Sequence, residues 1–391
     1  MPIRDDLKLL YLSAFCRFAH AYLRKRPRLK MGQSFFAPSI KIVARYRRAG
    51  GITNGAIHNA LALQSLGYNV ERVDVSSAIR NPLKSIVCSD GGSFIFHCDG
   101  AQFPLFAWAL RRNFGHGQMI GYFAWELADP PVAWPKYDDL WDEIWTPSAF
   151  AAQSLAKRFE CPVRVVPHVV VNDGVPRSWR KGEEPLTFLT MGDTRSSLAR
   201  KNPRAVVAAF QQAFPNETDV GLVVKLQVNR STAELHNLIA AIGNDQRIRV
   251  VRETLARSEI DRLFTSSHVY VSMHRAEGFG LPLLEARTFG LATIATAWSG
   301  NLDFMTAQDS ILIPYELVRM WDEGGVYGEV TWAEPDVGAA ASAMRRFYED
   351  PSYMAQIAKA GWEASRPEAQ LARFAKAVSL AKGPHAETAS R

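Results

Sequence analysis

The chain has 391 residues, of which 47% are hydrophobic and 22% charged, and it carries a net charge of +7. This length and composition predict about two globular domains, and the absence of low-complexity tracts and short repeats excludes disordered, collagen-like and solenoid proteins. The four cysteines form no C-x-x-C pair and no zinc-ligand spacing, so the sequence predicts neither a disulfide framework nor a cysteine metal site. We expect a reducing compartment.

Positive charge is concentrated at the N-terminus. Residues 1–50 contain twelve Lys and Arg against two Asp, a net charge of +10. Residues 7–23 are largely apolar, but the stretch is too short for a membrane span, and Lys8, Arg17 and His20 make it too polar. Acidic residues near the start disfavour a signal peptide, and no nucleic-acid motif accompanies the charge. An amphipathic helix on an anionic membrane and a solvated surface helix both fit the pattern.

Short β-rich runs alternate with helical patterns from residue 40 onward. In the first half, the expected strands are residues 41–46, 69–75, 93–97, 118–123, 143–146 and 163–166. Helices are expected at residues 54–66, with Gly67 as the C-cap, and at residues 148–159, with Ser148 as the N-cap. This alternation predicts a parallel sheet covered by helices on both faces.

The alternation restarts after residues 172–185, a polar stretch with Gly and Pro that is typical of an interdomain linker. The expected strands are residues 186–191, 221–226, 247–251, 268–272, 291–295 and 310–313. The expected helices are residues 203–214, 258–266 and 281–289, with Gly290 as a C-cap, and residues 336–382 read as helical with breaks. We therefore predict two doubly wound α/β domains whose strand carboxyl ends face a shared cleft.

This pattern divides the chain into five segments. They are a basic N-terminal segment (1–35), an N-terminal α/β domain (36–171), a linker (172–185), a C-terminal α/β domain (186–365) and a C-terminal helix and tail (366–391). We expect the last segment to return toward the N-terminal domain.

The segment 272–285 combines a strand end, a glycine-bearing loop and a helix start. Pro282 suits the first helical turn, which leaves backbone N–H groups around residues 279–283 at an open helix N-terminus, a site that favours an anion. Gly278 and Gly280 let a ligand such as a diphosphate approach the main chain closely.

Two carboxylates belong to the same segment, Glu277 before the helix and Glu285 within it. Carboxylates do not bind phosphate, so beside a nucleotide they would accept hydrogen bonds from its hydroxyls, above all from a vicinal ribose diol. In the alternative interpretation, Glu285 only complements the helix dipole and Glu277 is a solvated loop residue.

Residues 277–285, EGFGLPLLE, resemble the E-x7-E motif of the retaining glycosyltransferases of family 4, also described as glycosyl transferases group 1. The similarity extends to residues 200–203 (RKNP), to Lys225 at a strand end and to residues 297–305 (AWSGNLDFM). Several matches in the same order are more specific than one glycine motif. The resemblance implies the α/β fold called GT-B, with two Rossmann-like, doubly wound parallel-sheet domains facing a central cleft.

The resemblance also implies roles for these residues. Glu285 would bind the ribose, and Lys201 would neutralise the diphosphate with Arg200 and Lys225 as further donor-binding cations. Glu277 and the backbone of residues 279–281 (Phe279, Gly280 and Leu281) would hold the donor sugar and the diphosphate, with Gly278 as a further donor-binding residue. A solvated helix start is the alternative for Arg200 and Lys201. The family usually has a further arginine after the glycine of the preceding strand, whereas here Gly192 is followed by Asp193-Thr194-Arg195.

In the N-terminal half, residues 50–55 (GGITNG) join the first strand to a helix. By themselves they fit plain turn chemistry, but they resemble the glycine loop of the GT-B acceptor domain, where Gly51 would lie against the diphosphate. His97 ends a strand and is expected to point into the crevice, where the resemblance makes it catalytic together with Glu277; a satisfied structural histidine is the alternative.

Three further residues of this half follow strands. The resemblance places Trp125 and Glu126 on the acceptor side. It also matches His168 to a strand-end position near the hinge, with no role assigned.

The function implied by the resemblance is transfer of a sugar from a nucleotide diphosphate sugar to a hydroxyl, with retention at the anomeric carbon and with no metal or other cofactor. The expected acceptor is a saccharide or lipid-linked saccharide in envelope or exported polysaccharide synthesis. We expect a cytoplasmic protein that can lie on the inner face of the plasma membrane through residues 1–30, with no nucleic acid partner. A GT-B nucleotide-sugar epimerase and a non-catalytic nucleotide-sugar-binding protein are the alternatives.

Overall fold

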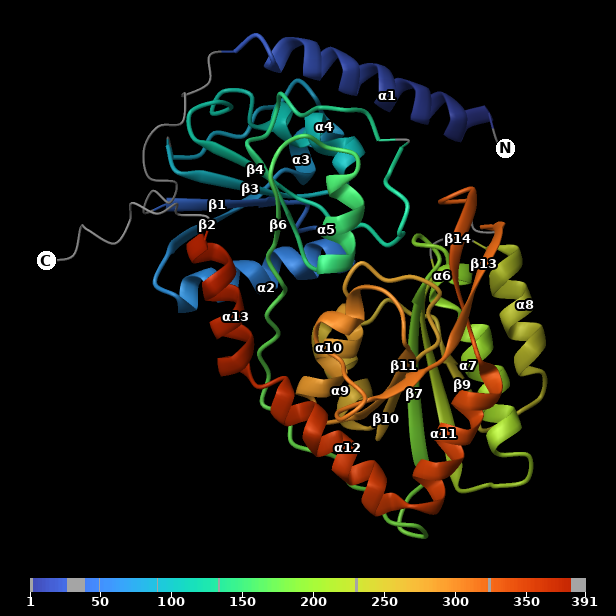
Figure 1. The fold of residues 1–391 in the computed structure, drawn as a ribbon. Coiled ribbons are helices and arrows are strands. Elements are labelled where there is room, and N and C mark those ends of the chain that lie inside the picture. Colours follow the sequence, from blue (N-terminus) through green and yellow to red (C-terminus); the bar gives the residue numbers. More distant parts are fainter. Residues whose placement is uncertain are drawn as a thin grey trace, which may run out of the picture. The chain divides into compact units, whose positions relative to one another are not determined.

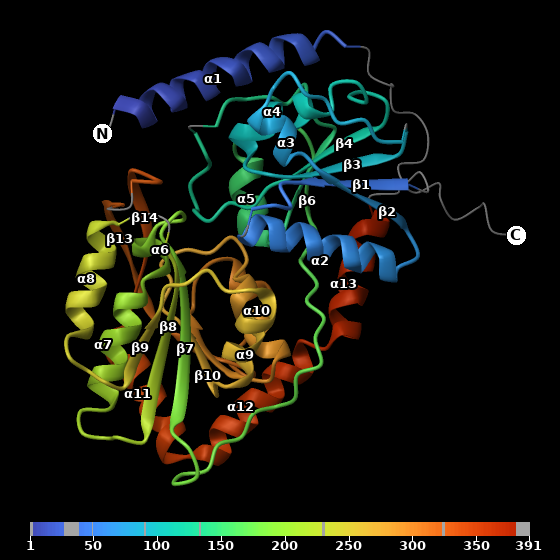
Figure 2. The same cartoon turned by 180° about the vertical axis from the view of Figure 1, so that it is seen from behind.

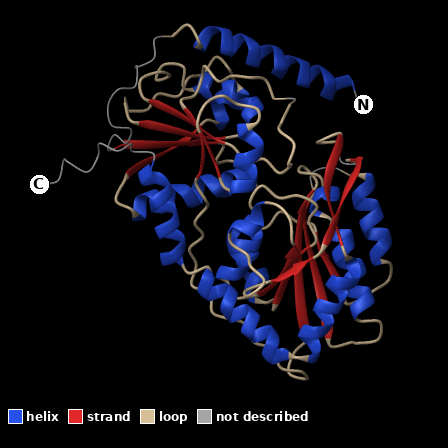
Figure 3. Cartoon of the chain, in the orientation of Figure 1, coloured by secondary structure: helices blue, strands red, loops and turns tan. Residues whose placement is uncertain are grey.

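The computed structural model describes residues 3–26, 39–48, 50–89, 91–132, 134–228, 231–322 and 325–380. Parts of the predicted basic segment and tail, residues 27–35 and 381–391, lie outside the described residues. The chain divides into two compact units: the first contains residues up to 125, residues 130–169 and residues from 370 on, and the second contains residues 126–129 and 170–369. Each unit is built on one six-stranded parallel sheet (Figures 1 and 3).

The first unit has the strand order β2-β1-β3-β4-β5-β6, with all neighbouring strands parallel. The strands are β1 (Ser39–Ala44), β2 (Asn69–Asp74), β3 (Ser93–His97), β4 (Gln118–Tyr122), β5 (Glu143–Thr146) and β6 (Val163–Val165). Every residue of β3, β4 and β5 is buried, which is typical of strands covered on both faces. The predicted parallel sheet of the first half is thus confirmed.

Helices cover both faces of this sheet (Figure 2). They are α1 (Ile3–Leu23), α2 (Gly51–Ser65), α3 (Ser76–Arg80), the 3-10 helix η1 (Gly100–Gln102), α4 (Phe103–Ala109), α5 (Ala149–Ala156) and α13 (Pro367–Leu380). Side chains of α1, α3, α4 and α5 share one core with Phe94 and Phe96 of β3. Side chains of α2 and α13 share a second core with Ile95, which points to the opposite face because strand side chains alternate.

The second unit has the strand order β12-β11-β10-β7-β8-β9, again with parallel neighbours. The strands are β7 (Leu186–Asp193), β8 (Val220–Gln227), β9 (Ile248–Val251), β10 (Val269–Ser272), β11 (Ala292–Thr296) and β12 (Ile311–Ile313). The helices are α6 (Leu198–Lys201), α7 (Pro203–Ala213), α8 (Ala233–Ile242), α9 (Arg257–Thr265), α10 (Leu281–Thr288), the 3-10 helix η2 (Gly300–Asp303), α11 (Val337–Glu349) and α12 (Pro351–Ala364). Side chains of α7, α8, α11 and α12 pack on one face, and those of α9 and α10 pack on the other.

An antiparallel hairpin interrupts this alternation and was not predicted. Its strands β13 (Tyr315–Trp321) and β14 (Glu329–Pro335) pair in register from Tyr315 opposite Pro335 to Trp321 opposite Glu329. The connection contains Gly325 and Gly328, both with positive φ, as tight turns require. Two β-rich runs separated by glycines are a hairpin signal that the sequence does contain.

None of the helices that the structure describes is both long enough and apolar enough to cross a bilayer.

Candidate functional site

The predicted anion site forms where the chain leaves β10 and enters α10. Gly280 precedes the helix with φ of 90°, in the left-handed region that favours glycine, and Pro282 lies in the first turn. The N-cap residue Gly280 has no side chain with which to cap this N-terminus. The positive end of the helix dipole is therefore directed at the loop of residues 273–280.

A second loop packs directly on this one. Glu277 N donates to Ser299 Oγ at 2.9 Å, and Gly300 N donates to Glu277 O at 3.0 Å. A Cβ at Gly300 would lie 2.4 Å from Gly278 O, so only glycine allows this approach. The segment 297–305 thus holds the Glu277 loop in place.

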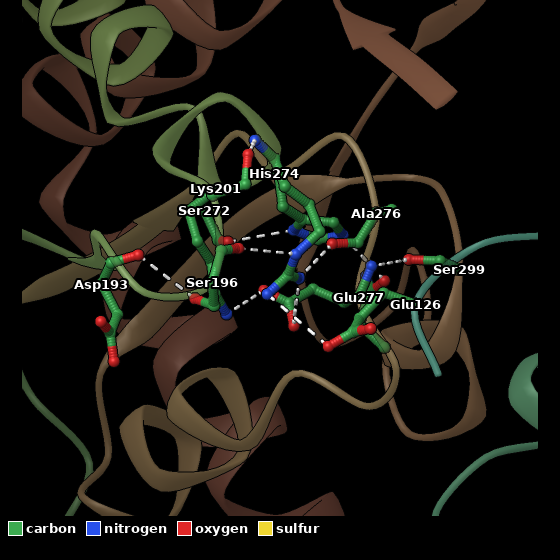
Figure 4. A network of polar contacts seen from close by, with 12 residues as sticks. Glu126, Asp193, Ser196, Lys201, Ser272, His274, Ala276, Glu277 and Ser299 are labelled. Atoms are coloured by element: carbon green, nitrogen blue, oxygen red, sulfur yellow. Dashed lines mark hydrogen bonds and ion pairs between the residues drawn. The ribbon is translucent and has the colours of Figure 1, made fainter. Parts of the chain in front are cut away.

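Two cations converge on the Glu277 carboxylate (Figure 4). Lys201 Nζ donates to Oε1, and Arg200 NH1 lies 3.4 Å from Oε2 while it donates to Ala276 O at 2.7 Å. Both cations belong to the short helix α6, whose N-cap Ser197 accepts a hydrogen bond from Arg200 N. Asn202 ends α6 in the left-handed conformation, with φ of 51°, which asparagine tolerates better than most residues.

These charges determine the protonation states. Burial by itself raises the pKa of Glu277, but Lys201, Arg200 and His274 more than offset burial and lower this pKa to about 2. Burial likewise acts against the charge of Arg200, yet the negative groups around it raise its pKa above the usual value. The Lys201 side chain is 17% exposed, against 3% for Arg200 and 8% for Glu277, so Lys201 is the most exposed of these three residues.

The two residues predicted on the acceptor side, Trp125 and Glu126, belong to different compact units. Glu126 belongs to the second unit, where its Oε1 lies 3.8 Å from Arg200 NH2 and where it hydrogen-bonds Tyr327. Trp125 belongs to the first unit, where its ring packs edge-on against Trp134 with 5.1 Å between ring centroids. The acceptor role of both residues stays a prediction, and Glu126 also belongs to the environment of Arg200.

The second motif carboxylate, Glu285, is buried on α10 and ion-paired with Arg257. Arg257 starts α9 and is 46% exposed, and its pKa is raised because Glu285 and Asp261 outweigh the effect of burial. The sequence analysis missed Arg257, since nothing local marks it as a partner of Glu285. A ribose that binds Glu285 must share this carboxylate with Arg257 or displace it.

Two other cations of the second unit do not join the Glu277 cluster. Lys225 Nζ donates to Leu226 O at 2.8 Å, and burial lowers its pKa. Arg195 donates to both carboxylate oxygens of Asp193, at 2.7 to 3.1 Å. After Gly192, where the resemblance led us to expect a further arginine, Arg195 is thus paired with Asp193.

Two residues missed by the sequence analysis, His274 and Arg275, join the Glu277 loop to neighbouring elements. His274 Nδ1 lies 3.0 Å from Ser272 Oγ, and its Nε2 lies 3.1 Å from Trp298 O, which joins the loops after β10 and β11. Arg275 donates to Ala199 O of α6 at 2.8 Å and to Glu334 of β14 at 2.6 Å. The only sequence signal for them is their position immediately before the motif.

In the first unit, Gly51 begins α2 and Gly55 lies one turn further on. A Cβ at Gly55 would lie 2.5 Å from His168 Cε1, so this glycine is explained by packing. A Cβ at Gly51 would meet nothing within 4 Å, and its φ is not in the left-handed region. The structure of the unit therefore gives no reason for glycine at position 51.

His97 is 1% exposed and lies at the carboxyl end of β3. Its ring stacks on Tyr122 with 4.2 Å between centroids, and burial lowers its pKa to about 3, so the imidazole is neutral at neutral pH. Tyr122 OH also lies 3.3 Å from His168 Nδ1, which is 3.1 Å from Asn59 Oδ1. His97 Nε2 has no hydrogen-bond partner among the described residues. Its catalytic role stays a prediction.

The variant Gly51→Ala separates a ligand-contact role from a structural one. We expect unchanged or slightly higher stability, because Ala is favoured over Gly in a helix by about 1 kcal/mol and meets no neighbour. If the backbone at position 51 approaches a diphosphate, transfer should nevertheless fall by about tenfold or more. Thermal denaturation and donor turnover measure the two effects, and full turnover in the variant would remove Gly51 from the site.

Comparison with known protein families gives one match. Residues 175–363 match the model of the family described as glycosyl transferases group 1. This span contains Lys201, Glu277 and Glu285. No curated protein matches the chain by sequence.

Solved structures show similarity over a larger part of the chain. The pneumococcal O-GlcNAc transferase GtfA, solved with UDP and GlcNAc, has a TM-score of 0.53 at 15% identity and covers 78% of this chain, which spans only 59% of GtfA. Anabaena HepE, solved with UDP and glucose, has a TM-score of 0.58 at 12% identity, covering 88% of this chain and 98% of its own. Sucrose-phosphate synthase from Thermosynechococcus elongatus has a TM-score of 0.59 at 15% identity with the same coverage. These similarities show that the fold is GT-B.

Proposed function

We propose that the protein is a retaining glycosyltransferase that moves a sugar from a nucleotide diphosphate sugar to a hydroxyl group. The observation that carries this proposal is the convergence of Lys201 and Arg200 on Glu277 beside the N-terminus of α10, where the N-cap residue is a glycine. Glu285 lies on the same helix, so one element presents both a diphosphate site and a ribose acceptor. The family match over residues 175–363 supports the assignment.

The cluster provides the charge that the reaction needs. A departing nucleoside diphosphate gains negative charge in the transition state, and fixed cations stabilise it without reorganisation. Lys201 and Arg200, together with the dipole of α10, supply this positive charge with no metal ion. When Lys201 turns to the diphosphate, the Glu277 carboxylate is released to accept hydrogen bonds from the donor sugar.

Retention follows from attack on the face that the diphosphate leaves. The bond between the anomeric carbon and the phosphate oxygen breaks, and the acceptor oxygen bonds to the same face. The acceptor proton passes to the departing phosphate oxygen, so no protein nucleophile is needed. Glu277 is a binding group here, because its pKa of about 2 makes it a poor proton acceptor at neutral pH.

Donor specificity is tested with a panel of UDP-, GDP- and ADP-sugars, with UDP-sugars first because the GtfA and HepE structures contain UDP. A nucleotide at about a hundredfold its Kd should stabilise the protein by about 2.7 kcal/mol. With an acceptor, NMR should show nucleoside diphosphate release and a product with the donor's anomeric configuration. An inverted product would contradict retention, conversion of the donor alone to its epimer would indicate an epimerase, and binding without turnover would indicate a non-catalytic protein.

The acceptor belongs to the same proposal: a saccharide or lipid-linked saccharide of envelope or exported polysaccharide synthesis, used at the inner face of the plasma membrane. Phe18 and Tyr22 of α1 are 56% and 40% exposed, and Arg17 and Arg26 lie beside them in the sequence. Exposed aromatic rings among arginines are suited to an anionic membrane surface. In contrast, Ala19 on the same helix is fully buried.

The variant Phe18→Ser/Tyr22→Ser tests this membrane contact. It keeps the buried residues Ala19 and Leu23 of α1 but removes the packing of both rings on Trp108, so thermal denaturation must first show that the variant is folded. Each arginine or lysine near an anionic surface contributes about 1 kcal/mol to binding. Burial of the two aromatic rings adds a favourable free energy in proportion to their apolar area, and the variant removes this second contribution. We therefore expect the partition coefficient between phosphatidylglycerol vesicles and buffer, measured by sedimentation, to be at least about tenfold lower than that of the wild type. Equal sedimentation of both proteins would refute the contact.

A further inference from the structure

The turn of the β13–β14 hairpin is folded around a buried carboxylate. Asp322 follows β13 and is fully buried. Its Oδ2 accepts hydrogen bonds from Val326 N at 2.8 Å and Tyr327 N at 3.0 Å, which closes the turn. Its Oδ1 accepts a hydrogen bond from Ser197 Oγ at 2.6 Å. One carboxylate therefore joins the hairpin to the residue that precedes α6.

Ser197 needs such a partner because its backbone is strained. Its φ of 62° lies in the left-handed region, which costs a residue other than glycine about 1–3 kcal/mol. Its hydroxyl also accepts a hydrogen bond from Arg200 N at 3.1 Å and so caps the helix that carries Arg200 and Lys201. The orientation of this hydroxyl determines where α6 begins, and Asp322 fixes that orientation.

The hairpin is linked to Arg200 at two further points, each time through one intervening residue. Tyr327, in its turn, hydrogen-bonds Glu126, whose carboxylate lies 3.8 Å from Arg200 NH2. On β14, Ala333 N donates to Arg275 O at 3.0 Å, and Arg275 N donates to Arg200 O at 2.8 Å. The hairpin thus supports α6 through its turn and through one of its strands.

The ribose-binding carboxylate is held by a different element. Glu285 lies on α10 and pairs with Arg257 of α9. Changes in the hairpin should therefore weaken diphosphate binding and leave ribose binding unchanged.

We infer that the β13–β14 hairpin positions α6 for diphosphate binding, and that Asp322 acts as a positioning residue through Ser197. The inference rests on the proposed function, because it assigns Lys201 and Arg200 to the diphosphate. When the Asp322–Ser197 hydrogen bond is lost, affinity for a nucleoside diphosphate falls, whereas affinity for the nucleoside, which engages Glu285 alone, does not.

The test compares binding of UDP with binding of uridine, and in parallel GDP with guanosine and ADP with adenosine, by calorimetry and ligand-observed NMR. Asp322→Ala removes the link from the hairpin side. Ser197→Gly removes the hydroxyl from the other side and relieves the backbone strain, since glycine tolerates positive φ, so it guards against a folding defect. Arg319→Ala is the matched control, because Arg319 is an exposed residue of the same hairpin paired with Glu329.

For the diphosphate that binds the wild type, both link variants should raise Kd about tenfold, equivalent to about 1.4 kcal/mol, with the nucleoside Kd changed by less than about twofold. Asp322→Asn, whose amide can still bridge Ser197 and the turn, should restore most of the affinity. The inference is overturned if Asp322→Ala and Ser197→Gly match Arg319→Ala, or if both ligands weaken equally. If the wild type binds no diphosphate, the proposed function fails and the inference fails with it.

Discussion

Lys201→Met is expected to lower the transfer rate by about a hundredfold to a thousandfold, the usual effect of removing one charge-stabilising donor from a transition state. The reason is that Lys201 is the more exposed of the two cations paired with Glu277. Charge on the diphosphate grows as the glycosidic bond breaks, so kcat should fall more than donor affinity. Steady-state kinetics with the donor identified by the panel gives both quantities.

Arg195→Met is the matched control for this substitution. Arg195 is also a cation after β7, but it is paired with Asp193. We expect its loss to change kcat by less than about threefold, which corresponds to under 1 kcal/mol. If Arg195→Met reduced the rate as much as Lys201→Met, the assignment of the diphosphate to Lys201 would be wrong.

Glu277→Gln is expected to reduce the free energy of unfolding at pH 7 by about 3 kcal/mol, because removing one partner of a buried ion pair leaves the other charge uncompensated. Arg200 is buried and would keep Glu126 at 3.8 Å as its remaining carboxylate. Urea denaturation at pH 7 measures the loss. Glu329→Gln, which breaks the exposed pair with Arg319, should cost less than about 1 kcal/mol.

The stability difference between the wild type and this variant is also expected to depend on pH. The pKa of Glu277 is lowered to about 2 in the folded protein from the ordinary value of 4.5. The carboxylate therefore contributes stability that is complete above about pH 4.5 and is lost as the pH falls toward 2. The stability difference between wild type and Glu277→Gln should shrink over this interval. A difference that stayed constant from pH 7 to pH 3 would mean that Glu277 carries no such charge interaction.

The features that could be predicted from the sequence are those that depend on residues close together in the chain, such as strand bounds, helix caps and short motifs. The bounds of β3 and β5 agree with the predicted runs 93–97 and 143–146, because β-forming apolar residues make up the centre of each strand. Ser148 caps α5 as predicted, with its hydroxyl accepting from Ala151 N. Glu277 and Glu285 could be assigned together because only seven residues of one loop and helix lie between them.

Features that depend on contacts between distant segments were missed. Arg257 meets Glu285 only because α9 and α10 pack on the same face of the sheet. Asp322 and Ser197 are 125 residues apart, and neither position shows a local pattern. Trp125 and Glu126 look like one pair in the sequence, but the chain passes from one unit to the other between them. Pairing partners of this kind follow from the tertiary fold and not from residue spacing.

The most direct test of the account is a crystal structure of the protein with the nucleoside diphosphate selected by the panel. We predict that the diphosphate lies at the N-terminus of α10 with Lys201 on its oxygens, and that Glu285 accepts hydrogen bonds from both ribose hydroxyls. A nucleotide bound elsewhere, with Lys201 still paired to Glu277 and Glu285 still paired to Arg257, would contradict it.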